Sequence, residues 1–230
     1  MRIAVTGTNC VGKSTLIEDI KSNWNTYTEP KLDWRKKTKK RHSHKFTEAK
    51  QKKILENMIT ALQSTGRNDN YILDRCPVDN LVYSLWANDQ GMVSDDFIVY
   101  TMERVKYALT MIDLILFIPI TNSAAIDFES VIESKDYDVD QKFIEEIDFL
   151  FKSIYNRWDK PTTPYVQFDD KPHVIEVFGT PGQRVEMIKL YITETGEFYG
   201  ESSIISPDEL EELEKLNKEF GLTDKKLPSL

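Results

Sequence analysis

The chain has little cysteine and no long apolar run. The first argues against a disulfide-stabilised protein, and the second argues against a membrane-spanning one. Only two cysteines, Cys10 and Cys76, occur in 230 residues. Two are too few for a disulfide framework, so we expect a reducing, cytoplasmic setting. No stretch approaches the roughly 18 consecutive apolar residues that a membrane-spanning helix requires, so we expect no membrane association. The apolar stretch at the start of the chain is short and strand-like, and we expect no signal peptide before it.

Positive charge is scarce except in one segment. The formal net charge is −8, but residues 31–53 carry a net charge of +9, which leaves about −17 on the rest. The plain interpretation of this segment is a solvated surface. Alternatively, the basic residues of 35–53 contact the phosphates of a nucleic acid while Trp34 stacks on a base, or they attract a small phosphorylated acceptor. His42 and His44 lack a nearby third ligand, so we expect no metal site there.

Apolar runs alternate with helical patterns along most of the chain. We predict strands at residues 2–5, 26–28, 71–73, 114–118 and 173–178. We predict helices at residues 14–24, 46–64, 77–88, 95–110, 140–158 and 181–191. This alternation favours an α/β fold with a central, mostly parallel sheet, in which ligands bind beyond the carboxyl ends of the strands. We expect one domain over residues 1–192 and an extension over 193–230, with a short hairpin at 195–196 and a helix at 206–221.

The sequence GTNCVGKST follows the first predicted strand and precedes the first predicted helix. It matches G-x-x-x-x-G-K-[ST], in which glycines let backbone N–H groups point at phosphate oxygens. Lys13 would reach the β- and γ-phosphates, and the Ser14 hydroxyl would bind Mg²⁺. The predicted nucleotide-binding residues of this phosphate loop are Gly7, Thr8, Asn9, Cys10, Val11, Gly12, Lys13, Ser14 and Thr15. The motif indicates that a nucleoside triphosphate binds here, but it does not identify the group that receives the phosphate.

Two further polar positions follow predicted strands. Asp74 and Arg75 end the strand in YILDRCP, where a carboxylate can bind Mg²⁺ and a guanidinium can clamp an acceptor. Glu29 ends the second predicted strand in TYTEP, where it can accept a proton from an attacking hydroxyl or hold the acceptor's sugar. Each also has a plainer interpretation, as a helix cap for Asp74 and Arg75 and as an ordinary loop residue for Glu29.

Taken together, these motifs resemble those of the P-loop nucleoside and nucleoside-monophosphate kinases. The order GxxxxGKS, Glu-Pro and Asp-Arg is most similar to that of thymidylate kinases, and HVIEVFGTPGQRVEMI resembles the closing strand and adenine-side loop of these enzymes. The resemblance covers about residues 1–192. It implies a three-layer P-loop NTPase fold, ATP as donor, Mg²⁺ as cofactor, and a possible homodimer.

The same resemblance implies roles for individual residues. Lys13 would neutralise phosphate charge, and Ser14 and Asp74 would bind the metal. Arg75 would clamp the acceptor, and Glu29 would act as base or acceptor ligand. The residues implied to lie near the adenine are Gly179, Thr180 and Pro181.

The sequence departs from the family in its lid, residues 121–156, which usually supplies arginines to the transferring phosphate. This segment contains no arginine, and its only basic residues are Lys135, Lys142 and Lys152. Either a lysine takes the role, with weaker geometry, or charge arrives from Arg104, the basic segment or a partner.

Three functions remain open from the sequence. The first is an ATP-dependent kinase acting on a (deoxy)nucleoside monophosphate or nucleoside. The second is a kinase of the same fold whose acceptor is a hydroxyl on DNA or RNA, at an end or a modified base. The third is an ATPase or nucleotide switch in which water is the acceptor. No guanine-reading N-K-x-D motif stands at the expected place, which disfavours a GTPase.

Overall fold

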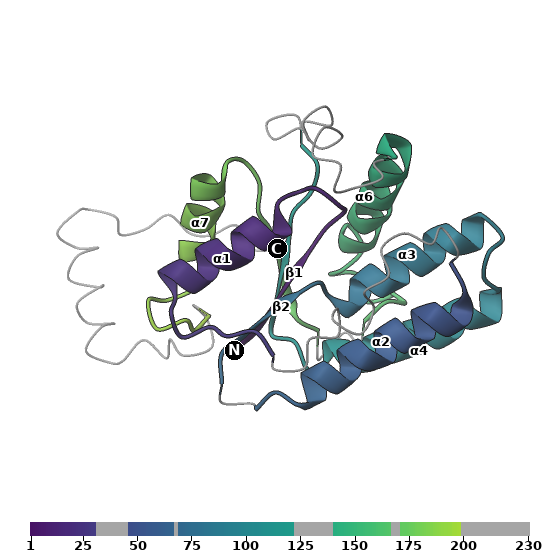
Figure 1. Ribbon diagram of the computed structural model, residues 1–230, viewed down its shortest axis with the longest axis horizontal. Helices are drawn as coiled ribbons and strands as arrows, with labels where there is room; N and C mark the ends of the chain where they lie inside the picture. The colour runs from purple at the N-terminus through teal and green to yellow at the C-terminus, as the bar shows by residue number, and fades with distance from the viewer. Residues whose placement is uncertain (31–45, 67–68, 122–139, 167–170, 199–230) are drawn as a thin grey trace, which may run out of the picture.

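A computed structural model describes residues 1–30, 46–66, 69–121, 140–166 and 171–198. At its centre is a parallel sheet of four strands in the order β2-β1-β3-β4 (Figure 1). The strands are β1 (Arg2–Thr6), β2 (Tyr71–Asp74), β3 (Leu114–Phe117) and β4 (His173–Glu176). The predicted α/β class with a parallel sheet is therefore confirmed.

The strand order indicates a ligand site at the edge of the sheet formed by the carboxyl ends of its strands. The chain leaves β1 toward β2 on one side, and it leaves β3 toward β4 on the other. Because β1 and β3 are neighbours, these connections diverge beyond their carboxyl ends, which is where α/β sheets bind ligands. Pairing of Val5 with Asp74 and of Thr6 with Phe117 places the ends of three strands at this edge.

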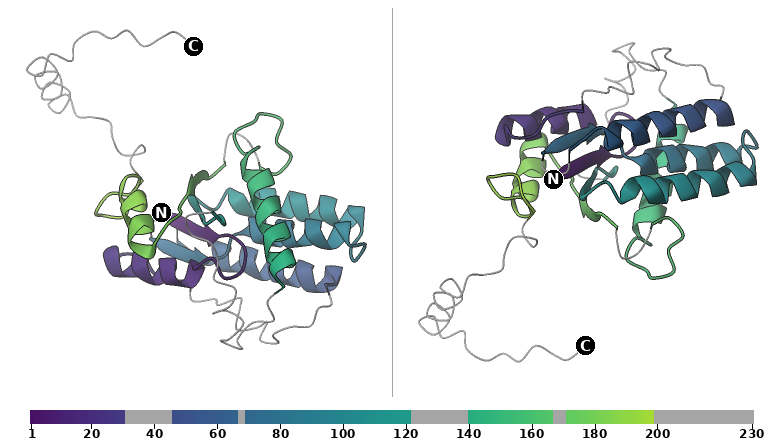
Figure 2. Two further views of the ribbon diagram at one scale, coloured as in Figure 1. Left: turned by 90° about the horizontal axis from the view of Figure 1, so that it is seen from above. Right: turned by 90° about the horizontal axis from the view of Figure 1, so that it is seen from below.

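Helices cover both faces of the sheet. Helices α1 (Lys13–Asn23) and α7 (Pro181–Lys189) lie on one face, and four helices lie on the other (Figures 1 and 2). Those four are α2 (Glu48–Gln63), α3 (Pro77–Asp89), α4 (Asp95–Leu109) and α6 (Gln141–Tyr155). Successive residues of a strand point to opposite faces, so Ile3 and Val5 join the core beneath α1, while Ala4 joins the core beneath the four helices.

Local signals set where the helices begin. The hydroxyls of Thr47 and Ser94 accept hydrogen bonds from the backbone N–H groups of Lys50 and Phe97, and the Asp140 carboxylate caps α6 in the same way. A side-chain acceptor at this position satisfies N–H groups that have no partner within the helix. The predicted helices are accordingly found with ends shifted by a few residues.

The second predicted strand, residues 26–28, is reduced to a single bridge between Thr28 and Tyr71. The Thr28 N–H donates to the Asn70 carbonyl, and the Ile72 N–H donates to the Thr28 carbonyl. The next bond of a parallel ladder would need the N–H of residue 30, which is Pro30 and has none. Pairing with β2 is therefore limited to the single bridge at Thr28.

Several other predictions concern the ends and loops of the chain. The hairpin at 195–196 is confirmed as a bridge between Ile192 and Phe198. The basic residues 31–45, most of the lid (122–139) and the helix at 206–221 lie outside the described residues. Among the helices that the structure describes, none combines the length and apolar character needed to cross a membrane.

Candidate functional site

The phosphate loop is a tight turn between β1 and α1. Gly7 has a φ of 139°, and a Cβ there would meet the Ile118 carbonyl oxygen at 2.6 Å, so a larger residue does not fit. Cys10 and Gly12 are also in the left-handed region, with φ values of 65° and 86°. Left-handed residues alternating with ordinary ones turn successive N–H groups toward one side, which is the geometry of an anion-binding nest.

Lys13 lies beneath this turn and is buried. Its Nζ donates to the Gly7 carbonyl oxygen at 2.9 Å and to the Thr8 carbonyl oxygen. Burial, followed by repulsion from Arg75, lowers the pKa of Lys13 to about 7. The described hydrogen bonds of the Lys13 ammonium group therefore go to backbone carbonyl oxygens of the phosphate loop and not to a carboxylate.

Asp74 and Arg75 flank the loop from the β2 side. Asp74 pairs in the sheet with Val5, which stands two residues before Gly7 in the chain. The Asp74 side chain is half-buried. Arg75 takes a left-handed conformation, with φ of 86°, and its N–H donates to the Val5 carbonyl oxygen. This backbone turn directs the chain away from the sheet and into α3, and it leaves the Arg75 side chain beside the phosphate loop.

Hydrogen bonds join the Arg75 guanidinium to the phosphate loop itself. Its Nη2 donates to Asn9 Oδ1 at 3.1 Å, and its Nη1 lies 3.4 Å from both Tyr83 Oη and Asp79 Oδ1. The Tyr83 hydroxyl also donates to Asn9 Oδ1, at 3.3 Å. Burial works to lower the pKa of Arg75, but Tyr83 and Asp79 outweigh it and hold that pKa above its usual value.

Asp79 is a site residue that the sequence reasoning missed. It is 2% exposed, and its Oδ2 accepts hydrogen bonds from Thr6 Oγ1 at 2.6 Å and from the Cys76 N–H at 2.8 Å. Burial raises the pKa of Asp79, against the opposing effects of Arg75 and Lys13. The available signal was its position three residues after the cap of α3, where acidic residues close a capping box.

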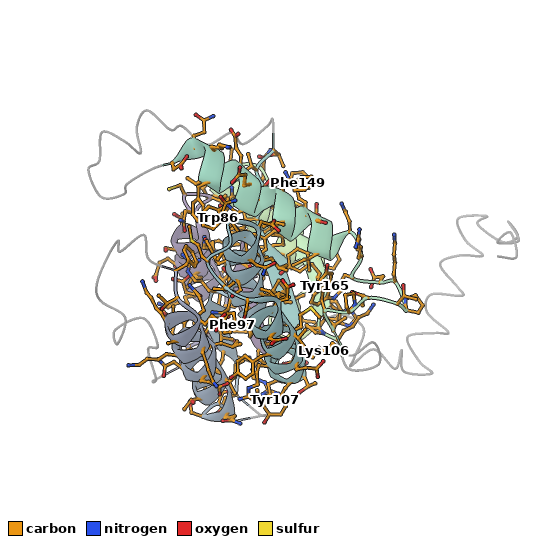
Figure 3. The ribbon with its side chains drawn as sticks, turned by 90° about the vertical axis from the view of Figure 1, so that its right-hand side faces the viewer. Trp86, Phe97, Lys106, Tyr107, Phe149 and Tyr165 are labelled. Atoms are coloured by element: carbon orange, nitrogen blue, oxygen red, sulfur yellow. The ribbon has the colours of Figure 1, made fainter. Side chains whose placement is uncertain are left out.

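Aromatic side chains from three segments gather next to Arg75. The ring of Tyr83 lies 5.7 Å from the Arg75 guanidinium and 6.0 Å from the ring of Phe143 on α6. Trp86 contacts both Phe46 and Phe143, with ring centroids 5.5 Å and 4.7 Å apart. Trp86 lies directly beside α6 in Figure 3, and its Nε1 donates to Glu146 at 2.8 Å. A cluster of mutually tilted aromatic rings therefore adjoins the Arg75 guanidinium through Tyr83.

The basic groups considered as replacements for the lid arginines have partners of their own. Lys152 pairs with Asp148 at 2.6 Å and donates to the Ile120 carbonyl oxygen. Arg104 forms two short bonds to Glu56, between α4 and α2. Lys142 lies 3.6 Å from Glu146, and Lys135 lies outside the described residues. Each of the described candidates is therefore held in an ion pair with a carboxylate.

Glu29 sits apart from the residues described above. It follows Thr28, which pairs with the first residue of β2, so it lies beside the start of that strand rather than beyond its end. Its described ion pair is with Lys21 of α1, at 3.2 Å. Its role as base or acceptor ligand stays a prediction.

The loop between β4 and α7 flanks the phosphate loop on the opposite side from β2. Gly179 has a φ of 84°, the Thr180 hydroxyl caps α7, and Pro181 begins that helix. Arg184 of α7 donates from Nη1 to the Val11 carbonyl oxygen at 2.8 Å and from Nε to the Gly179 carbonyl oxygen at 3.0 Å. The structure therefore brings the predicted loop at 179–181 against the phosphate loop, through a residue that the sequence reasoning did not single out.

Comparison with known proteins matches this arrangement to a family and to solved folds. The model of a family described as an AAA domain matches residues 2–163. No curated protein sequence matches the chain. A deoxyadenosine kinase from M. mycoides, solved with the products dCMP and dCDP, superposes with a TM-score of 0.58 at 17% identity, covering 83% of this chain and 97% of that one.

Two other solved structures are similar at lower scores. A thymidylate kinase from Candida albicans gives a TM-score of 0.51 at 17% identity, covering 82% of this chain and 89% of that one. A NadR protein in complex with NR gives 0.50 at 11% identity, and the match covers 99% of this chain but 54% of that protein. The resemblance to nucleoside and nucleotide kinases is thus confirmed for the fold, and the chain belongs to the AAA-domain family whose model spans its phosphate loop and β2 flank.

Proposed function

We propose that the chain is an ATP-dependent phosphotransferase that moves the γ-phosphate to a (deoxy)nucleoside monophosphate or a nucleoside. The observation that carries this proposal is the hydrogen bond between Arg75 Nη2 and the Asn9 side chain of the phosphate loop. An acceptor-side cation and the phosphate-binding loop are thereby built into one structure. A guanidinium fixed on this flank can hold an acceptor by forked hydrogen bonds, as a kinase requires of its second substrate. The solved structures of similar fold include nucleoside and nucleotide kinases, which supports this choice over a hydrolase.

The phosphate loop accounts for donor binding. The ammonium group of Lys13 now bonds to loop carbonyl oxygens, and it can turn its protons to the β- and γ-phosphates when these occupy the nest. The start of α1 adds the partial positive charge of a helix N-terminus. Together these groups neutralise negative charge as it develops on the leaving phosphate.

Mg²⁺ fits the residues present at this edge. Ser14 is exposed at the start of α1 and Asp74 is half-buried at the end of β2, which supplies one hydroxyl and one carboxylate oxygen. Within the described part of the chain, no cluster of three acidic, histidine or cysteine residues could hold a metal by itself. The donor set therefore suits an ion that takes its other ligands from phosphate oxygens and water, as Mg²⁺ does. Ser14 and Asp74 would hold the ion, which would supply positive charge against the phosphates.

The β2 flank accounts for acceptor binding. Arg75 presents a planar fork of donors that suits phosphate or hydroxyl oxygens. The ring of Tyr83 lies beside Arg75, where a nucleobase of the acceptor could contact it, and the rings of Phe46 and Phe143 pack against Tyr83 and hold it in place. A role for Glu29 at the acceptor's sugar or attacking hydroxyl rests on the family resemblance alone, because Glu29 lies beside the start of β2 and pairs with Lys21.

The test is release of ADP from Mg·ATP with acceptors offered singly. The panel contains deoxynucleosides, ribonucleosides, their monophosphates, and single- and double-stranded oligonucleotides with and without hydroxymethylated pyrimidines. We expect one small nucleoside or nucleotide to stimulate release strongly. Stimulation by oligonucleotides alone would replace the small acceptor with a polymer and give residues 35–53 a role. A steady rate without any acceptor would mean that water is the acceptor.

A further inference from the structure

Arg184 is a buried cation whose hydrogen bonds join two loops. It is 9% exposed, and its Nη1 and Nε donate to the carbonyl oxygens of Val11 and Gly179. A Cβ on Gly12 would meet Arg184 Nη1 at 3.0 Å, so the guanidinium lies directly against the phosphate loop. Burial lowers the pKa of Arg184, while Asp19 opposes that effect. A charge is rarely placed in such surroundings without a specific partner.

The position of Arg184 relative to the proposed acceptor site suggests what it serves. Arg75 and Tyr83 lie on the β2 side of the phosphate loop, whereas β4 and α7 lie on the other side of β1 and β3. In phosphoryl transfer the attacking and leaving oxygens are roughly in line with the phosphorus. An acceptor on the Arg75 side therefore requires the rest of the donor to extend toward the opposite flank, where Gly179 and Thr180 lie.

We propose that Arg184 is a positioning residue for the nucleoside half of the donor, because its guanidinium fixes the spacing between the phosphate loop at Val11 and the β4–α7 loop at Gly179. This inference rests on the proposed function, since it takes the β2 side as the acceptor side. A planar fork with two donors on two backbone oxygens sets the separation of those backbones, which a single ammonium group cannot do. The distance between the two loops then matches the distance between the base and the phosphates of a bound nucleotide.

The proposal predicts different effects on the affinities for ATP and for inorganic triphosphate, which share the triphosphate group. ATP reaches both loops, whereas inorganic triphosphate reaches only the phosphate loop. We therefore expect Arg184→Gln to weaken ATP binding by more than about threefold and by at most about a hundredfold, since the upper limit is the full cost of a lost charge-assisted hydrogen bond. Binding of inorganic triphosphate should change by less than about threefold, because Lys13 and the nest remain.

The experiment measures both affinities by titration calorimetry for the unchanged chain and for Arg184→Gln, Arg184→Lys and Arg2→Gln. Arg184→Lys keeps the charge but not the fork, so it should resemble Arg184→Gln. Arg2 is a matched control, since it is also 9% exposed but lies at the opposite end of β1, near Asp113. Arg2→Gln should leave both affinities unchanged even if it lowers the melting temperature.

Each other result contradicts the proposal. An equal loss for ATP and inorganic triphosphate, with rescue by lysine, would show that Arg184 acts as a charge on the phosphates. Unchanged ATP affinity in a folded Arg184→Gln variant would reduce Arg184 to a packing contact. Failure of the proposed function is separate: the unchanged chain would then bind ATP with the expected dependence on Arg184, yet no acceptor would stimulate transfer.

Discussion

The two flanks of the phosphate loop are built differently. On the β2 flank, side chains bond to side chains: Arg75 contacts Asn9, Asp79 and Tyr83. On the β4 flank, a single guanidinium bonds to two backbone carbonyl oxygens, those of Val11 and Gly179. A network of side chains can change its specificity by one substitution, whereas a backbone clamp fixes a distance whatever side chains surround it. The difference fits a variable acceptor on one flank and a constant donor on the other.

The flanks also differ in how their charge is balanced. Arg75 faces the buried Asp79 carboxylate, and Lys13 lies near both of them. Arg184 bonds to neutral carbonyl groups, and the negative charge of Asp19 works to raise its pKa against the effect of burial. Charge on the β2 flank is therefore coupled to Lys13 and hence to the phosphates. Five measurements test this contrast, starting with the largest expected effect.

Lys13→Ala should lower kcat by at least about a thousandfold, because it removes the cation that both flanks share. Turnover with saturating acceptor and Mg·ATP measures the effect. Lys189→Ala is the control, since Lys189 is an exposed residue of α7 that pairs with Glu186. Near-normal turnover in Lys13→Ala would remove the basis of the proposed function.

Nucleotide binding should weaken as the pH rises above 7. Lys13 has a pKa of about 7 in the unliganded chain, so above that pH it is mostly neutral and must take up a proton when phosphates bind. Affinity should then fall by up to about tenfold per pH unit between pH 7 and pH 9. Calorimetry in buffers of different ionisation enthalpy should detect proton uptake at pH 8 but little at pH 6.

The stability of the unliganded chain should respond to Lys13 in the opposite sense. Because the pKa of about 7 in the folded chain lies below the ordinary lysine pKa of 10.5, the unfolded chain binds more protons between these two pH values. The contribution of Lys13 therefore makes the free energy of unfolding increase as the pH rises from 7 to 10.5. Lys13→Met should flatten both pH dependences, and retention of both would assign them to another group.

Asp79→Asn should damage the β2 flank and spare the other. We expect the acceptor's kcat/KM to fall about ten- to thirtyfold, because Arg75 loses a fixed negative partner. ATP affinity should fall by less than this, because Asp79 acts on Lys13 through its charge and not through a hydrogen bond. Steady-state kinetics with each substrate varied in turn separates the two. Asp89→Asn, at the exposed end of α3, is the control. A loss confined to ATP binding would place Asp79 with the donor instead.

Tyr83→Phe should have the smallest effect. It removes the hydroxyl that donates to Asn9 and lies near Arg75 but keeps the ring, so the acceptor's KM should rise about threefold with kcat nearly unchanged. Tyr107→Phe serves as the control, since that hydroxyl bonds to Gln63 on an exposed surface. A large fall in kcat would mean that the Tyr83 hydroxyl takes part in the transfer itself.

Local features of the fold were predictable from the sequence. The phosphate loop was recognised from glycine and lysine spacing, and the predicted helices were found, several of them with a side-chain cap at the start such as Ser94 or Thr180. These features depend on backbone geometry and hydrogen bonds within a few residues. The strand predicted at residues 26–28 forms only one bridge. Pairing with β2 would need an N–H at residue 30, and Pro30 has none.

The partners of the site residues were not predictable in the same way. Asp79 had the signature of a capping residue, and its contacts with Thr6 and Arg75 required the β1–β2 register. Arg184 looked like one more charged residue in an amphipathic helix. Its burial became visible only when α7 was packed beside α1.

By itself, then, the sequence determined a strand, a phosphate-binding turn and a helix, together with the alternation that produces a parallel α/β sheet. Only the tertiary structure decided which side chains surround that turn. The bond from Arg75 to Asn9 joins residues 66 apart in the chain, and the bond from Arg184 to Val11 joins residues 173 apart. Such contacts depend on strand order and helix packing, which are set by burial of the whole core and not by any short stretch of residues.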